Sequence, residues 1–272
     1  MLIPRIVTAI LLILLVAGLL LLNSPQAWLI FTLVMTVIAG WEWSGFVLNK
    51  SMAFRFEYAL MIVVLSLLSI QFASTQLLAA MTLMVMLAMV ISVSQYQRSQ
   101  AHIQIKSSIL VLGLGGLVLV NFATAFMTFV TAFSPGIVLL SLMTIWALDT
   151  GAYFSGRRFG KHKLASIVSP GKTWEGVIGG GVLALLVAGF GLNYLALDLK
   201  VTDGIVAVGF MAIAVFSVFG DLFESLMKRQ VGLKDSGQLL PGHGGVLDRA
   251  DSLLVAIPMF YFIWQAVVVI KL

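Results

Sequence analysis

The sequence of 272 residues contains no cysteine, and only 10% of its residues are charged. Without cysteine the protein has no disulfide framework, no thiolate nucleophile and no thiolate metal site. Soluble domains usually carry roughly 25% charged residues. Here 61% of the residues are hydrophobic and the mean hydropathy is +1.09, which excludes a soluble enzyme and a disordered chain. The composition therefore indicates a polytopic membrane protein.

Long apolar runs locate the membrane helices, because a helix needs about 20 residues to cross a bilayer core of about 30 Å. The first run follows Arg5 and lacks the short apolar region and cleavage site of a secretion signal, so we expect it to be retained as a helix. The sequence thus predicts an all-α integral membrane protein, a bundle of about nine transmembrane helices. The expected spans are 6–22, 27–43, 58–74, 77–94, 109–132, 135–153, 176–197, 204–223 and 252–270.

The basic residues lie almost entirely on one side of these spans. The N-terminus and the loops at 44–57, 95–108, 154–175 and 224–251 hold 14 of the 16 Lys and Arg residues. The positive-inside rule then predicts that the N-terminus and these loops lie in the cytoplasm. The net charge of +5 accordingly reflects orientation and gives no reason to expect a nucleic-acid partner.

The two parts of the chain differ in composition. Residues 1–108 form the first four predicted spans and are nearly free of ionisable groups within them. Residues 109–272 form a predicted catalytic region with cytoplasmic loops 154–175 and 224–251. Glu42 and Glu57 are exceptions near the cytoplasmic ends of spans two and three. We interpret Glu42, which stands between two tryptophans, as an interfacial or locally paired carboxylate rather than a catalytic one.

Four aspartates are predicted at the cytoplasmic face. Asp149 lies inside span six or near its cytoplasmic edge, where an ionisable side chain is a functional candidate. Asp221 ends span eight, and Asp248 and Asp251 share one helix face at the start of span nine. Hard oxygen ligands beside basic loops favour a Mg²⁺ site. The alternative is that Asp248 or Asp251 simply caps the helix.

A polar stripe is predicted along the end of span eight. If the helix continues past 223, then Ser225, Lys228 and Arg229 share a face with Asp221. A carboxylate, a hydroxyl and two cations in this order suit a metal-bound phosphate. The alternative is an interfacial cationic helix end held by lipid headgroups.

Three further sites lie in or next to the loops. Lys172 stands in a Gly-Lys-Thr turn that can offer a cation and backbone N–H groups to phosphate, although Ser166 rules out a P-loop. Glu175 fits either a helix-dipole role or a functional one. His243, flanked by glycines, is either a ligand contact or a solvated side chain. The glycines at 179–181 predict close packing of span seven on a neighbour.

The second loop resembles the signature of the phosphatidate cytidylyltransferase family, the CDP-diacylglycerol synthases. The family pattern is S-x-x-K-R, then K-D, then H-G-G-x-x-D-R-x-D. It is matched by Ser225, Lys228, Arg229, Lys234, Asp235, His243, Gly244, Gly245, Asp248, Arg249 and Asp251. The stretches D-T-G-A-Y-F and S-P-G-K-T-W-E-G also resemble family features, so the resemblance spans 148–252.

The resemblance implies a reaction and a set of roles. CTP and phosphatidate would give CDP-diacylglycerol and pyrophosphate at the cytoplasmic face, for phospholipid synthesis. Asp221 and Asp248 would bind Mg²⁺, and Asp251 and Asp149 would complete a second cation site, with K⁺ as its ion. The resemblance also implies that the protein contacts membrane lipids and forms a homodimer. The residues expected to hold phosphates are Lys172, Lys228, Arg229 and Arg249, and those expected to contact nucleotide or pyrophosphate are Ser225, Lys234 and His243.

Two other classes remain as alternatives at this stage. A transporter or channel with basic cytoplasmic loops would place ionisable groups near the membrane midplane and show two matching halves. A CDP-alcohol phosphotransferase is another CDP-lipid-handling enzyme, but its D-G-x-x-A-R opening and D-x-x-x-D close are not seen.

Overall fold

The computed structural model describes residues 2–47, 51–199, 201–242 and 244–268. Helices account for most of this part of the chain, and eight of them are long and apolar enough to span a membrane. The apolar segment Ile6–Leu22 of the first helix is somewhat shorter. The protein is therefore a helical, polytopic integral membrane protein, as the sequence predicts. The long helices are α1 (Leu2–Leu22), α2 (Pro25–Trp43), α3 (Met52–Phe72), α4 (Thr75–Arg98), α5 (Ser108–Ala132), α6 (Pro135–Phe159), α7 (Trp174–Leu195), α8 (Asp203–Gln230) and α10 (Leu253–Val267).

Serine and threonine hydroxyls define where many of these helices begin. In each case the hydroxyl accepts a hydrogen bond from the backbone N–H three residues later, which pairs a donor that the helix itself cannot satisfy. Such pairing matters at a membrane boundary, where unsatisfied backbone groups are costly. Helices α2, α3, α4, α5, α6 and α7 are capped by Ser24, Ser51, Ser74, Ser107, Ser134 and Thr173.

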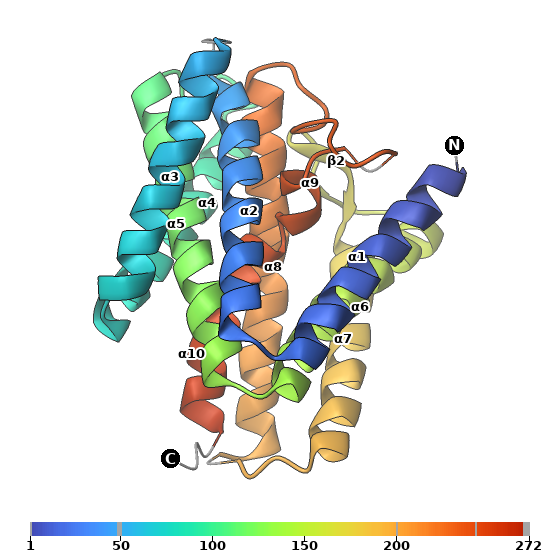
Figure 1. Ribbon diagram of the computed structural model, residues 1–272. Coiled ribbons are helices and arrows are strands. Elements are labelled where there is room, and N and C mark those ends of the chain that lie inside the picture. The colour runs from blue at the N-terminus through green and yellow to red at the C-terminus, as the bar shows by residue number, and fades with distance from the viewer. Residues whose placement is uncertain (1, 48–50, 200, 243, 269–272) are drawn as a thin grey trace.

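The helices form a main bundle with a tilted side group. Helix α5 packs against α2, α3, α4 and α10, while α8 packs against α4, α7 and α10. Figure 1 shows α1 running obliquely, away from the axis of the main bundle, and it contacts α6 and α2. The Trp264 indole on α10 donates to the Ser141 hydroxyl on α6 at 2.8 Å, which joins the two groups. Large apolar side chains remain exposed on α1, α3, α4 and α7, where lipid would cover them.

Helices α6 and α7 lie very close together, as the glycine run predicts. A Cβ atom on Gly180 would stand 2.5 Å from the Leu148 carbonyl oxygen. One on Gly179 would overlap the Ser155 hydroxyl. The backbones approach because these positions carry no side chain. This contact fixes the α6–α7 pair on which part of the polar site is built.

The structure differs from the prediction in the cytoplasmic loops. Helices α6 and α8 extend to Phe159 and Gln230, beyond the predicted ends at 153 and 223. The rest of loop 154–175 contains a small antiparallel hairpin of β1 (Lys163–Ala165) and β2 (Ser169–Thr173), which the all-α prediction did not include. The last span, predicted at 252–270, is helical over Leu253–Val267, and residues 269 and 270 lie outside the described part.

The polar connections collect at one end of the molecule. Figure 1 shows the α2–α3, α4–α5, α6–α7 and α8–α9 connections at its upper end. Two short helices, η1 (Ser44–Phe46) and α9 (Leu247–Ala250), belong to this end. The charged residues of the loops at 154–175 and 224–251 therefore come together even though they are far apart in sequence.

Candidate active site

Helix α8 continues past the predicted end of its span and carries the predicted polar stripe. The Ser225 hydroxyl lies 3.5 Å from the Asp221 carboxylate one turn earlier, and both face the interior of the site. Lys228 is buried one turn further on. Arg229 departs from the stripe, because it is exposed and donates to the Leu233 carbonyl at 3.2 Å. Three of the four predicted residues thus line one side of α8.

Lys228 is held between two carboxylates. Its ammonium donates to the Asp248 carboxylate at 2.5 Å and forms an ion pair with Glu224 one turn back on α8. Glu224 is completely buried. Sequence analysis missed Glu224, although a carboxylate four residues before a lysine in an apolar helix is a recognisable signal. The ammonium has three N–H donors, so two carboxylates leave capacity for a third acceptor.

Asp248 organises the loop that precedes it. One carboxylate oxygen pairs with Lys228, while the other accepts hydrogen bonds from two backbone N–H groups at 2.8 Å, those of Ser236 and Gly245. The Ser236 hydroxyl also lies 3.0 Å from this oxygen. Asp248 therefore combines a charge pair with a loop anchor. Its predicted role as a magnesium ligand stays a prediction.

The β-hairpin presents Lys172 to the site. Lys172, in β2, forms an ion pair with Asp221 on α8. The hairpin is fixed at its base, where the next residue, Thr173, caps α7 and accepts from the Gly176 N–H at 3.1 Å. The imidazole of His162, just before β1, lies 2.6 Å from the Glu175 carboxylate in the first turn of α7. Glu175 is therefore engaged in holding the hairpin.

Three of the predicted aspartates converge from different elements. The Ser252 hydroxyl donates to Asp149 on α6 at 3.3 Å, and the Ser252 N–H donates to Asp251 at 2.8 Å. Helix α8 is pressed against Asp251, because a Cβ on Gly220 would stand 2.7 Å from its carbonyl oxygen. Asp221 lies within electrostatic range of both other aspartates. Sequence positions 149, 221 and 251 thus meet in one region, with Lys172 beside them.

The magnesium site that the sequence predicts stays a prediction. Within the described ranges, no three Asp, Glu or His side chains lie close enough to hold one ion. The donor chemistry nevertheless suits a hard cation, since Asp149, Asp221 and Asp251 are carboxylates within electrostatic range of one another or of the Lys172 ammonium. Asp248 is the most heavily hydrogen-bonded of the four, since it pairs with Lys228 and accepts from Ser236 and Gly245.

The remaining predicted residues lie around this centre. Arg249 is exposed and lies within electrostatic range of Asp149. Lys234 is exposed on the loop that follows α8. His243 falls outside the described residues, so its predicted contact with a ligand stays a prediction.

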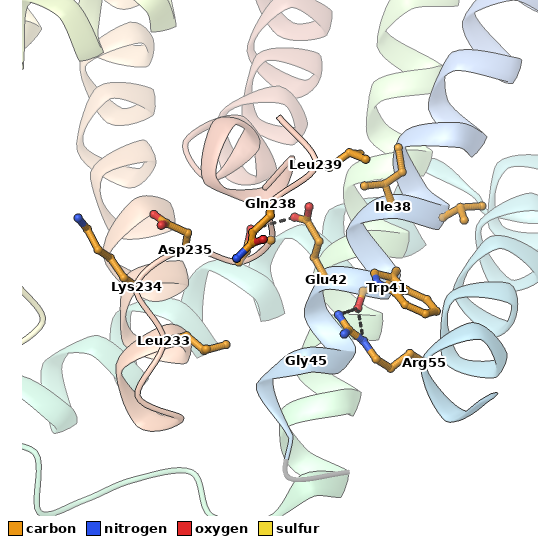
Figure 2. A pocket seen from close by; sticks show the side chains of 13 residues that line it. Ile38, Trp41, Glu42, Gly45, Arg55, Leu233, Lys234, Asp235, Gln238 and Leu239 are labelled. Carbon is orange, nitrogen blue, oxygen red and sulfur yellow. Dashed lines mark hydrogen bonds between the residues drawn. The ribbon is translucent and has the colours of Figure 1, made fainter. Parts of the chain in front are cut away.

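A cavity of about 800 Å³ opens beside the Asp248 loop, between α2 and segment 233–239. Its α2 side is apolar, with Val37, Ile38 and Trp41, while Lys234 belongs to the opposite polar side. Figure 2 shows Glu42 pointing from α2 toward the loop, and Arg55 turned to the Trp41 carbonyl. The guanidinium carbon of Arg55 also lies 4.6 Å from the centroid of the Trp41 ring. The cavity thus has an apolar wall and charged groups near its rim.

Comparison with known proteins identifies a family model that covers nearly the whole chain and individual relatives that match about half of it. The model of the cytidylyltransferase family matches residues 3–267. A phosphatidate cytidylyltransferase of Haemophilus influenzae is 52% identical over 132 residues, which cover 47% of this chain and 45% of the relative. The enzyme of the same name from Pseudomonas aeruginosa is 49% identical over 133 residues, or 48% of each chain. One from Staphylococcus haemolyticus is 42% identical over 136 residues, covering 49% and 52%. The matched stretch therefore spans about half the length of each relative.

Proposed function

The chain belongs to the cytidylyltransferase family, and we propose that it transfers the cytidylyl group of CTP to phosphatidate, giving CDP-diacylglycerol and pyrophosphate. The relatives at 41–52% identity carry the name of this activity. The observation that supports it in this chain is the pair of lysines, Lys172 and Lys228, which carboxylates hold at one end of the bundle. A transporter or channel would instead be expected to place ionisable groups near the membrane midplane and to show two matching halves.

In the proposed reaction a phosphate oxygen of phosphatidate attacks the α-phosphorus of CTP. The bond from this phosphorus to the β-phosphate oxygen breaks, and pyrophosphate leaves with the electron pair. The protein forms no covalent bond, so catalysis consists of positioning and of stabilising the charge on the phosphates. A cation that stays in place when substrate arrives, such as Lys228, is suited to this, because it needs no rearrangement during the reaction.

Each held lysine has a specific part in the proposal. Lys228 keeps one donor for a phosphate oxygen while Glu224 and Asp248 fix the other two. Lys172 exchanges its contact with Asp221 for a phosphate of the nucleotide. Arg229, Arg249, Ser225, Lys234 and His243 complete the proposed substrate contacts around this centre.

A divalent cation is part of the proposal. Magnesium would be held by Asp221 and Asp251, with Asp149 and Asp248 as further candidates and K⁺ as a second cation. When bound, it would neutralise negative charge on the CTP phosphates. The support is the convergence of Asp149, Asp221 and Asp251 from separate elements, since adjacent carboxylates repel unless a cation balances them.

The setting follows from the charge pattern and the cavity. We propose that the polar end faces the cytoplasm from the inner membrane, where CTP is available, in line with the positive-inside pattern. The cavity beside the loop, with its apolar α2 wall and polar opposite wall, suits an amphipathic substrate such as phosphatidate. A homodimer is proposed from the family resemblance alone.

Direct assay of the purified protein tests the function. The protein in lipid nanodiscs would receive radiolabelled CTP, phosphatidate and Mg²⁺, and labelled CDP-diacylglycerol and pyrophosphate would be quantified. We expect both products in equal amounts. Lys228→Met should reduce them at least 100-fold, while Lys161→Met, which removes an exposed cation from the α6–α7 connection, should not. Folded wild-type protein that forms neither product would refute the proposal.

A further inference from the structure

Glu42 is a buried carboxylate in the apolar first half of the chain. It lies in the last turn of α2 and only 3% of its surface is exposed. A buried carboxylate is costly unless donors surround it. The residue therefore needs partners, and they come from the far end of the sequence.

Three donors from the second half converge on this carboxylate. One oxygen accepts from the Val246 N–H at 2.9 Å, and the other accepts from the Leu247 N–H at 2.9 Å. The Ser236 hydroxyl reaches the second oxygen at 2.8 Å. About two hundred residues separate Glu42 from these donors in sequence. The contact thus attaches the loop before α9 to the end of α2.

The glycines of the loop show how closely it surrounds Glu42. A Cβ atom on Gly237 would stand 2.5 Å from one carboxylate oxygen, and one on Gly245 would stand 2.4 Å from the other. No side chain larger than hydrogen fits at either position without displacing the carboxylate. The backbone is therefore shaped around Glu42.

Ser236 connects Glu42 to the proposed site. Its hydroxyl lies between the carboxylates of Glu42 and Asp248, at 2.8 Å and 3.0 Å, and its N–H donates to Asp248. Asp248 in turn pairs with Lys228. A continuous chain of contacts thus runs from α2 through the loop to the ammonium on α8.

We propose that Glu42 is a positioning residue for the transfer reaction, fixing residues 236–237 and 245–247 of the loop so that Asp248 holds Lys228 in place. The inference rests on the proposed function. Glu42 itself acts through Ser236 and Asp248, and its position on α2 makes the first half of the chain part of the site. Interfacial placement alone does not explain three converging donors.

The test combines backbone hydrogen exchange with steady-state kinetics on Glu42→Gln in nanodiscs. Gln has the shape of Glu but turns an NH₂ group toward one of the N–H donors, so at least one hydrogen bond is lost. We expect amide exchange in peptides covering 236–247 to rise at least fivefold, with exchange in α5 unchanged. We also expect kcat to fall at least fivefold, with KM for CTP changed less than threefold. Glu57→Gln, which neutralises an exposed carboxylate on α3, should leave all these quantities unchanged.

The outcomes separate positioning from a purely structural role. Unchanged exchange in 236–247 would overturn the proposal. So would faster exchange with kcat per folded molecule reduced less than fivefold, or an effect confined to KM. If Glu42→Gln does not fold, Ser236→Ala tests the same contact between Glu42 and Asp248. A loss of kcat below threefold in Ser236→Ala would then overturn the proposal. The exchange measurement needs no turnover, so a wild-type protein inactive on CTP would refute the proposed function without deciding the role of Glu42.

Discussion

Replacing Asp248 with Asn tests whether this carboxylate acts as an anchor for Lys228 and the loop. The Asp248 and Lys228 side chains are only 5% and 9% exposed, so the pair is well shielded from solvent. Asn retains one acceptor oxygen but loses the charge and directs an NH₂ group toward a donor. The fold and the membrane insertion should be preserved, because Asn and Asp side chains have the same shape.

The size of the effect follows from the contacts that are lost. Removing one partner of a buried charge pair costs about 3–5 kcal/mol when the other is left uncompensated. Glu224 remains beside Lys228, so we expect the low end, about 3 kcal/mol. If this loss falls on the transition state, turnover drops about 100-fold, since each decade corresponds to about 1.4 kcal/mol.

The assay is initial-rate formation of CDP-diacylglycerol at several Mg²⁺ concentrations, with thermal unfolding measured in parallel. An anchor role predicts a loss that excess Mg²⁺ does not restore, because the missing charge served Lys228. Recovery of most of the activity at high Mg²⁺ would refute this reasoning and assign Asp248 to the metal. A loss below tenfold in folded protein would show that the anchor is dispensable.

The other predictions concern the hairpin lysine, the helix contact and the cation. Lys172→Met should raise KM for CTP or lower kcat so that kcat/KM falls at least 50-fold, as measured with radiolabelled nucleotide. Gly180→Ala should destabilise the protein by about 1–3 kcal/mol because its Cβ overlaps α6, whereas Gly189→Ala, with open space around it, should not; thermal unfolding in detergent compares them. Chelation of divalent cations should abolish turnover reversibly, and Asp221→Asn should weaken the Mg²⁺ dependence measured by titration.

Much of the fold could be predicted from local sequence. The apolar runs located the spans, and hydroxyl residues such as Ser134 mark helix starts because they satisfy free N–H groups. The glycines at 179–181 predicted the α6–α7 contact. The β-hairpin could not be predicted, because a short segment rich in Lys, Ser, Pro and Gly has no alternating apolar pattern. The ends of α6 and α8 were placed too early because the spans were bounded by apolar character, while the helices continue into polar residues.

The site was predictable where it follows one helix and unpredictable where it depends on packing. The spacing of Asp221, Ser225 and Lys228 placed them on one side of α8, as observed. Glu224 was missed because residue 224 falls in the predicted loop 224–251, whereas the structure buries it within α8. Arg229 was assigned to the stripe by spacing, yet it turns outward to the Leu233 carbonyl. Spacing defines a helical face, but neighbouring elements decide which residues at its edges are buried.

The role of the first four helices depends on contacts that sequence cannot show. Trp43, next to Glu42, donates to the Val111 carbonyl of α5 at 2.9 Å, and its ring centroid lies 6.0 Å from that of Phe223 on α8. Adjacent residues at the end of α2 are thus fixed to two different structures, Trp43 to α5 and α8, and Glu42 to the Asp248 loop. Phe223 immediately precedes Glu224 in α8. The end of α2 therefore packs near both carboxylates that hold Lys228: Trp43 contacts the residue before Glu224, and Glu42 contacts the loop before Asp248. The division at residue 108 therefore describes composition, while the packing that positions Lys228 crosses it.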